Sequence, residues 1–200
     1  VLIVLAVAAI GYVIGRQRAL NSAGGDSRDL HSLPSYYGAN VAMWTIVPAF
    51  AVLIVWLLAQ PIFVNSRVLD MLPQSAVAEG SSIGLVMSDV RRVADGLDVA
   101  VSEGAMTREQ ASSIRTEFTD VRERLGDVGV ALGSNVSSEV LRGAQRYRAL
   151  NATGYTAMSM VVMLIAFGGA AYSFMRSNAA FRARNVVEKG ILALLMFAAS

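Results

Sequence analysis

Residues 149–175 read ALNATGYTAMSMVVMLIAFGGAAYSFM, a run of 27 residues without one charged side chain. A helix rises about 1.5 Å per residue, so about 20 apolar residues cross the roughly 30 Å hydrocarbon core of a bilayer. A buried helix of a soluble protein is the alternative, but such helices rarely run this long without a charge. The run therefore predicts a transmembrane helix. Its small residues between Ala166 and Ser173 predict close packing against other helices.

The composition points the same way and excludes several classes of chemistry. Of the 200 residues, 54% are hydrophobic and 16% are charged, which is too apolar for an ordinary soluble domain. There is no cysteine and one histidine, His31, so neither a thiolate metal site nor a histidine pair is available. We expect His31 to be a solvated loop residue. The sequence predicts no catalytic, cofactor-binding or metal-binding residue, and we expect that the protein is not an enzyme.

Hydropathy divides the chain into seven predicted segments. They are a truncated transmembrane helix at 1–15, a cytoplasmic loop at 16–40, a second span at 41–64, a periplasmic helical hairpin or stalk at 65–148, a third span at 149–175, a second cytoplasmic loop at 176–189, and the truncated start of a fourth span at 190–200. Because both ends of the sequence lie in apolar runs, we expect it to be a fragment of a longer membrane protein. Pro48 and Pro61 fall in the second span, where membrane helices tolerate proline.

The segment at 65–148 carries two regular hydrophobic stripes. Their members, spaced alternately three and four residues apart, are Ile83, Met87, Val90, Ala94, Leu97 and Val101, and then Ala111, Ile114, Phe118, Val121, Leu125, Val128 and Leu132. Each stripe is typical of the narrow seam of a coiled coil. Gly104 can end the first helix, and Thr107 with Gln110 fits a capping box at the start of the second. We predict an antiparallel helical hairpin, followed by a helix that starts near Ser137 and runs on into the third span.

The basic residues predict the sidedness. Residues 16–40 hold three Lys or Arg and residues 176–189 hold four, and two spans separate these connections, so both must lie on one side. The positive-inside rule places that side in the cytoplasm. Residues 65–148, with ten Arg against twelve acids, then lie outside. The fold class expected is thus an all-α membrane protein with three to four transmembrane helices and an extramembrane hairpin between the second and third.

A known family matches two stretches of this sequence. Residues 33–49, LPSYYGANVAMWTIVPA, preceded by GRQRAL at 15–20, resemble the N-terminal region of the PstC-type permease subunit of bacterial phosphate ABC importers, in the longer form with an extension before the permease core. Residues 182–189, RARNVVEK, resemble the point where that core begins. The family's coupling loop for the ATPase and its path-lining spans lie later than residue 200, so no substrate-contacting residue carries over.

The resemblance implies a multi-pass subunit of the bacterial inner (plasma) membrane that imports inorganic phosphate. Its partners would be a second permease subunit, a cytoplasmic ATP-binding subunit that hydrolyses ATP, and a periplasmic phosphate-binding protein, within membrane lipid and without nucleic acid. The alternative is a bacterial transmembrane sensor or receptor with a periplasmic helical sensing domain. A sensor would continue after the third span into a long signalling helix, whereas here a new apolar run begins at Gly190.

The sidedness can be tested by cysteine labelling, because no native cysteine competes with an introduced one. Cysteines at Ser22 and Ser177 should be shielded from a membrane-impermeant thiol reagent in intact cells. A cysteine at Ser113 should react once the reagent can pass the outer membrane. Labelling at the first two positions with protection at Ser113 would reverse the topology.

Overall fold

The computed structural model describes residues 1–71, 83–115, 121–127, 129 and 136–199. The regular structure of these residues is helical and contains no strand. The elements are α1 (Leu2–Ser22), a 3-10 turn η1 (Ser27–Asp29), α2 (Pro34–Leu69), α3 (Ile83–Ser102), α4 (Arg108–Ser113), α5 (Val121–Gly126), α6 (Ser138–Arg176) and α7 (Ala183–Ala199). Among the described residues, α1, α2 and α6 are long and apolar enough to cross a membrane. The predicted all-α membrane fold is confirmed.

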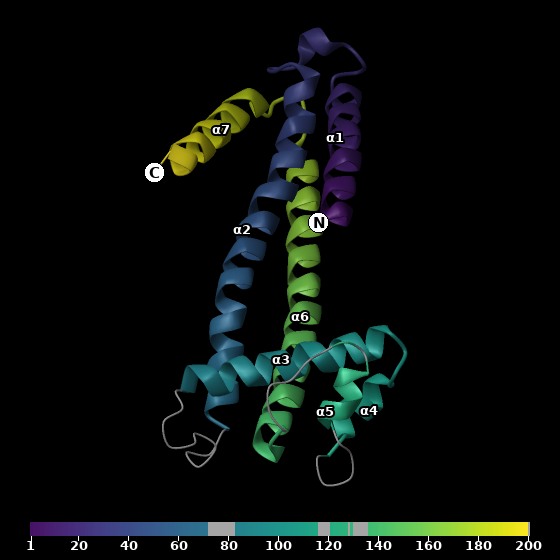
Figure 1. The fold of residues 1–200 in the computed structure, drawn as a ribbon. Helices are drawn as coiled ribbons and strands as arrows, with labels where there is room; N and C mark the ends of the chain where they lie inside the picture. Colours follow the sequence, from purple (N-terminus) through teal and green to yellow (C-terminus); the bar gives the residue numbers. More distant parts are fainter. Residues whose placement is uncertain (72–82, 116–120, 128, 130–135, 200) are drawn as a thin grey trace. The chain divides into compact units, whose positions relative to one another are not determined.

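The chain, whose helices are drawn in Figure 1, forms two compact units, and each has its own buried apolar side chains. Unit 1 comprises Val1–Trp56 and Ala157–Ser200, and unit 2 comprises Leu57–Thr156. Because α2 and α6 each cross the division, both helices contribute one part to unit 1 and another to unit 2. The two units are described separately below.

In unit 1 the helices are longer than the predicted spans. Helix α1 continues past Arg16 and Arg18 to Ser22, and α2 begins at Pro34, where proline is favoured in the first turn. The connection predicted at 16–40 is therefore helical at both ends. Charged side chains indicate where a helix leaves the hydrocarbon core of the membrane. The helix itself can continue beyond that point. The turn between the helices uses Gly24 and Gly25, whose φ angles are 63° and 92°.

Helix α2 runs unbroken through both of its internal prolines, as expected. A proline in a helix removes one backbone donor and leaves the carbonyl four residues earlier without its helical partner. For Pro48 that carbonyl belongs to Trp44. The neighbouring Thr45 turns its hydroxyl back to the Val41 carbonyl, at 2.8 Å, so its polar side chain is satisfied within the helix.

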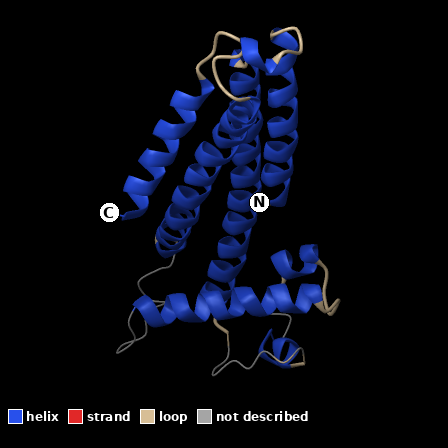
Figure 2. Cartoon of the chain, turned by 90° about the horizontal axis from the view of Figure 1, so that it is seen from above, coloured by secondary structure: helices blue, strands red, loops and turns tan. Residues whose placement is uncertain are grey.

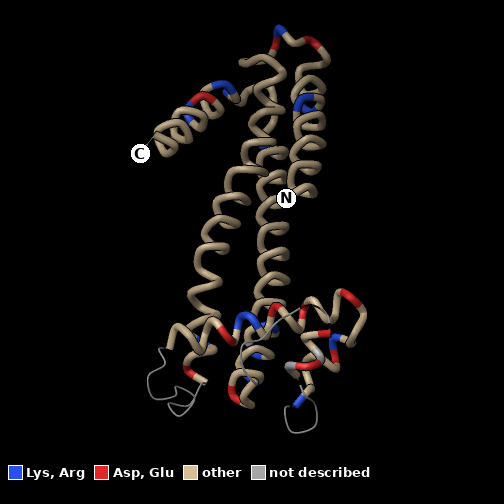
Figure 3. Tube along the Cα trace, in the orientation of Figure 1, with Lys and Arg blue, Asp and Glu red and all other residues tan. Residues whose placement is uncertain are grey.

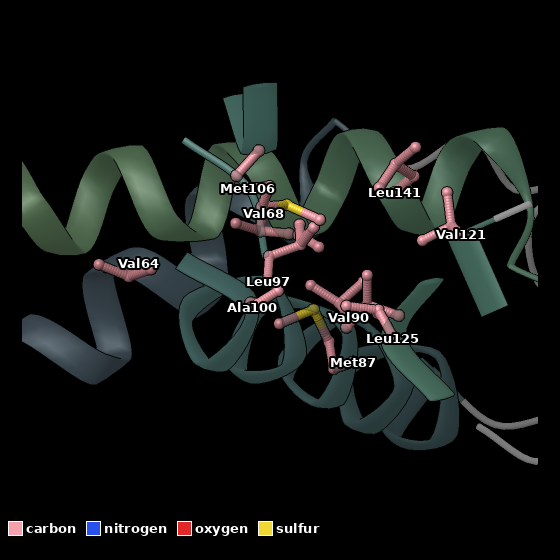
Figure 4. Close-up of a cluster of buried hydrophobic side chains, with 14 residues drawn as sticks. Val64, Val68, Met87, Val90, Leu97, Ala100, Met106, Val121, Leu125 and Leu141 are labelled. Atoms are coloured by element: carbon pink, nitrogen blue, oxygen red, sulfur yellow. The ribbon is translucent and has the colours of Figure 1, made fainter. Parts of the chain in front are cut away.

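In unit 2 the first predicted stripe is confirmed over most of its length and is wider than expected, but its first member, Ile83, is 57% exposed. Met87, Val90, Ala94 and Leu97 are buried, as predicted, but so are Val86, Val93 and Ala100, which lie beside the seam. Figure 4 shows α3 side chains meeting Val68 of α2, Leu141 of α6 and Leu125 of α5. A helix covered by several elements buries a broad face, whereas a helix in a two-stranded coiled coil buries a narrow one.

The second stripe differs from the predicted continuous arm. Its described members Ala111, Val121 and Leu125 are buried, but α4 ends at Ser113 and Ile114 is extended, with ψ at 140°. The stripe members Phe118, Val128 and Leu132 lie outside the described residues. Helix α3 lies across the parts of α2 and α6 that belong to unit 2 and does not continue either helix (Figures 1 and 2). In the described part of the chain, unit 2 is thus a small helical cluster in which the second predicted arm is divided between α4 and α5.

The predicted helix ends are confirmed. Gly104, with φ at 74°, follows the end of α3. The hydroxyl of Thr107 accepts the Gln110 N–H at 3.2 Å while the Gln110 side chain accepts the Thr107 N–H at 2.8 Å, which completes the capping box. The Ser137 hydroxyl accepts the Val140 N–H, and α6 then continues without interruption into the third span.

Leu97 is fully buried at the centre of the unit 2 core, so Leu97→Ala should destabilise this unit by roughly 2 to 5 kcal/mol through lost contact and a residual cavity. The measurement is hydrogen exchange of the α3 amides in the detergent-solubilised full-length protein. Val99→Ala is the control, since Val99 lies on the same helix and is 37% exposed. Equal acceleration of exchange by the two changes would contradict the position of the core.

Candidate functional site

Small residues bring the three long helices of unit 1 close together. A Cβ added at Gly169 of α6 would fall within 3.0 Å of the Trp44 carbonyl, the carbonyl that Pro48 leaves without a helical donor. A Cβ at Gly38 of α2 would lie 2.6 Å from the Tyr12 carbonyl oxygen of α1. Real Cβ atoms do not approach so closely, so only glycine allows these contacts. Close backbone approach through glycine is the usual way in which helices associate in lipid.

A buried polar pair also joins α2 to α6. Asn40 and Ser173 are each 1% exposed, and the Asn40 Nδ2 donates to the Ser173 Oγ at 2.7 Å. The Asn40 Oδ1 has no partner among the described protein atoms. Such a bond between membrane helices favours one register over another, because sliding would leave both groups unpaired in an apolar setting. The pair was not predicted from the sequence, although an Asn beside an apolar run is a signal that could have indicated it.

The connections at the C-terminal end of α1 and at the C-terminal end of α6 meet. The Tyr37 hydroxyl donates to the Phe181 carbonyl at 2.8 Å, and the Arg184 N–H donates to the Ser32 hydroxyl at 3.2 Å. The His31 Nδ1 lies 2.9 Å from the Ala179 carbonyl oxygen. His31 is thus exposed to solvent, as predicted, and also makes one contact with the other connection. These contacts place the two predicted cytoplasmic connections at one end of unit 1, as the count of spans requires.

That end of unit 1 is rich in arginine stacked on aromatic rings. The guanidinium of Arg18 lies 4.5 Å from the centroid of the Phe174 ring, and that of Arg176 lies 5.4 Å from the Tyr172 ring. Arg184 bonds Glu188 at 2.6 Å, and this hydrogen bond and the charge of the carboxylate raise the pKa of Arg184. Figure 3 shows basic residues near the C-terminal end of α1 and in the first turns of α7.

A groove of about 460 Å³ opens beside Arg18, between α1 and the end of α6. Ile14 and Phe174 supply apolar lining, and Gln17, Asn21 and Asn178 supply amide groups. The groove lining contains no acidic residue. Its donors and its one cation suit an anion, and its apolar lining suits a hydrocarbon chain.

Unit 2 has a polar depression of a different kind, about 560 Å³ in volume. Its lining includes Asp95, Asp98, Arg108 and Arg148, so the formal charges balance. Arg148, whose side chain is 13% exposed, donates through Nη2 and Nε to the Asp98 Oδ1 at 2.7 and 2.8 Å. The Asp98 side chain is 64% exposed, and its partner Arg148 lies 50 residues away in the sequence, so the pair was not predicted. This ion pair connects α3 to α6. Because Asp98 neutralises the Arg148 guanidinium, that guanidinium is poorly suited to bind an anion.

No group of three or more His, Cys, Asp or Glu that could hold a metal ion occurs among the residues that the structure describes. The chemical character of the molecule lies instead in packed apolar helices, the arginine-rich end of unit 1 and the polar depression of unit 2.

Comparison with known proteins places this architecture in a family. The model of a family described as "Phosphate ATP-binding cassette transporter" matches residues 1–171. The chain belongs to this family. The three apolar helices and the family match together indicate that the chain is a membrane protein. Neither the curated proteins nor the solved structures include a match.

The structure shows that one of the positions chosen for cysteine labelling, Ser177, is unsuitable. Ser177 is fully buried, and its hydroxyl donates to the Ser173 carbonyl at 3.0 Å, so a cysteine there would be shielded whichever side it faced. Asn178 is the next residue and is exposed. A cysteine at Asn178 therefore reports sidedness where one at Ser177 does not.

The glycine contacts predict an asymmetry between two adjacent positions of α6. Gly169→Ala should destabilise the helix packing of unit 1, because the added methyl group meets the Trp44 backbone. Gly168→Ala, which meets nothing within 4 Å, should be neutral or should stabilise the helix by about 0.5 to 1 kcal/mol. Thermal unfolding of the two variants in detergent gives the comparison. Similar midpoints for both would contradict the α2–α6 contact.

Proposed function

We propose that this chain is the N-terminal part of the permease subunit of an ABC importer for inorganic phosphate, in the inner membrane of a bacterium. The observation that carries the proposal is the family match, which extends over residues 1–171 and takes in α1, α2 and most of α6. The resemblance of residues 33–49 and 182–189 to the PstC-type permease supports the finer assignment to the permease subunit.

The described geometry suits a structural part of a permease and offers no machinery for chemistry. Its best-defined features are backbone contacts at Gly169 and Gly38 and the buried Asn40–Ser173 bond, all of which hold helices in register. We propose that ATP hydrolysis belongs to a cytoplasmic ATP-binding partner, and that this chain is not itself an enzyme. A second permease subunit and a periplasmic phosphate-binding protein complete the proposed assembly.

In this proposal unit 2 lies outside the membrane, where a phosphate-binding protein would approach. Residues 65–148 carry ten Arg against twelve acids, and Arg148 is already paired with Asp98, so direct capture of phosphate by unit 2 is disfavoured. We assign unit 2 to contacts with protein. A sensor is the less favoured function, because the family match names a transporter.

The test is the initial rate of radiolabelled phosphate uptake in cells that lack this protein. Uptake should be lost in those cells and restored by the full-length wild type, and the full-length protein should copurify with an ATP-binding subunit. Gly168→Ala should restore uptake fully, whereas Gly169→Ala should restore less because the helices pack poorly.

Unchanged uptake in cells without the protein would contradict the proposal. If the same cells also misregulated genes that respond to phosphate, the sensor function would replace it. The Gly168→Ala control separates loss of transport from a general effect of substitutions in this helix.

A further inference from the structure

We propose that the groove between the ends of α1 and α6 in unit 1 binds the phosphate group of an anionic membrane lipid, with Arg18 as its principal ligand. The groove is defined by Arg18 and its neighbours Gln17, Asn21 and Asn178, together with Ile14 and Phe174. This site is independent of phosphate transport and requires only that unit 1 lie in a bilayer.

The position of the groove along both helices matches the headgroup level. The apolar run of α1 ends at Gly15, and the charge-free run of α6 ends at Met175. Ile14 and Phe174 are thus among the last apolar residues of their helices, while Arg18 and Asn178 lie just beyond. The phosphate of a glycerolipid lies at this level, and its acyl chains extend toward the apolar side.

The groove is chemically suited to an anion with a hydrocarbon tail. Arg18 is stacked over Phe174 and makes no ion pair among the described residues, so its donors are available. The amides of Gln17, Asn21 and Asn178 add neutral donors. Ile10 and Ile14 lie one helical turn apart on α1, are 59% and 43% exposed, and offer an apolar path for an acyl chain.

Local features that would repel an anion are largely neutralised. The end of a helix carries partial negative charge on its free carbonyls. At the end of α1, however, the Leu20 and Asn21 carbonyls accept hydrogen bonds from the N–H groups of the following turn, including that of Gly25 at 2.9 Å. The Glu188 carboxylate at this end of the unit is paired with Arg184. The single cation therefore dominates the groove.

Charge complementarity selects an anionic lipid over a zwitterionic one. In phosphatidylcholine the choline ammonium competes with Arg18 for the same phosphate, whereas phosphatidylglycerol has no internal cation. One Arg near an anionic membrane surface is worth about 1 kcal/mol, which corresponds to about fivefold in affinity.

The test measures retention of phosphatidylglycerol and phosphatidylcholine of matched chain length on the purified, delipidated full-length protein by native mass spectrometry. Wild type should retain phosphatidylglycerol preferentially. Arg18→Gln should weaken that retention about fivefold, and Arg18→Lys should preserve most of it because the charge remains. Arg16→Gln is the matched control, since Arg16 is exposed two residues away and does not line the groove. It should have little effect.

Three results would overturn the proposal. Equal retention of the two lipids would remove the role of charge. Equal losses from Arg18→Gln and Arg16→Gln would indicate general attraction to the helix end instead of a site. Displacement of phosphatidylglycerol by excess inorganic phosphate would show that the groove holds the free anion, whereas resistance to it supports the lipid.

Discussion

The close contact between α6 and α2 depends on a glycine that faces a backbone carbonyl, and that carbonyl is one that a proline has left without its helical donor. Pro48 has no N–H to offer the Trp44 carbonyl, and Gly169 has no Cβ to keep the α6 backbone away from it. In lipid there is little hydrophobic drive for helices to associate, so contact area between backbones carries much of the stability. The Asn40–Ser173 bond adds a directional contact between the same two helices and fixes their register.

Unit 2 is held by a different force, the burial of apolar side chains away from water. Helix α3 supplies much of the core and is covered by parts of α2, α4, α5 and α6, with Leu97 at its centre. Its polar face carries charges, one of which reaches Arg148 on α6. Packing and this ion pair together orient α3 across the unit 2 portions of α2 and α6. The unit therefore presents charged side chains to solvent while its core stays apolar.

The charge distribution of unit 1 fits the proposed function. Basic residues gather at the end of unit 1 where two connections meet, which is the arrangement expected on the cytoplasmic side of a bacterial membrane protein. The aromatic rings of Phe174 and Tyr172 hold Arg18 and Arg176 at that end. Arginine and aromatic side chains of this kind anchor the ends of membrane helices at the interface.

Local patterns in the sequence determined much of this fold. Hydropathy predicted the three long helices, and the alternate spacing of apolar residues predicted most of the buried side of α3. Thr107, Gly104 and Ser137 predicted helix ends. Each of these signals lies within a few turns of the chain. The candidate site was harder to predict: no ligand-binding residue was expected from the sequence, because little in the local pattern around Asn40 or Arg18 sets these residues apart.

Tertiary structure decided what depends on partners distant in the chain. The width of the buried face on α3 follows from the number of elements that pack against it. The spacing of apolar residues within α3 does not report that number. The break after Ser113 and the extension of α1 to Ser22 escaped prediction because stripes and charges report burial and polarity, and neither fixes where helical hydrogen bonding stops. The roles of Gly169, opposite a carbonyl in another helix, and of Arg148, opposite Asp98, exist only once the helices have packed.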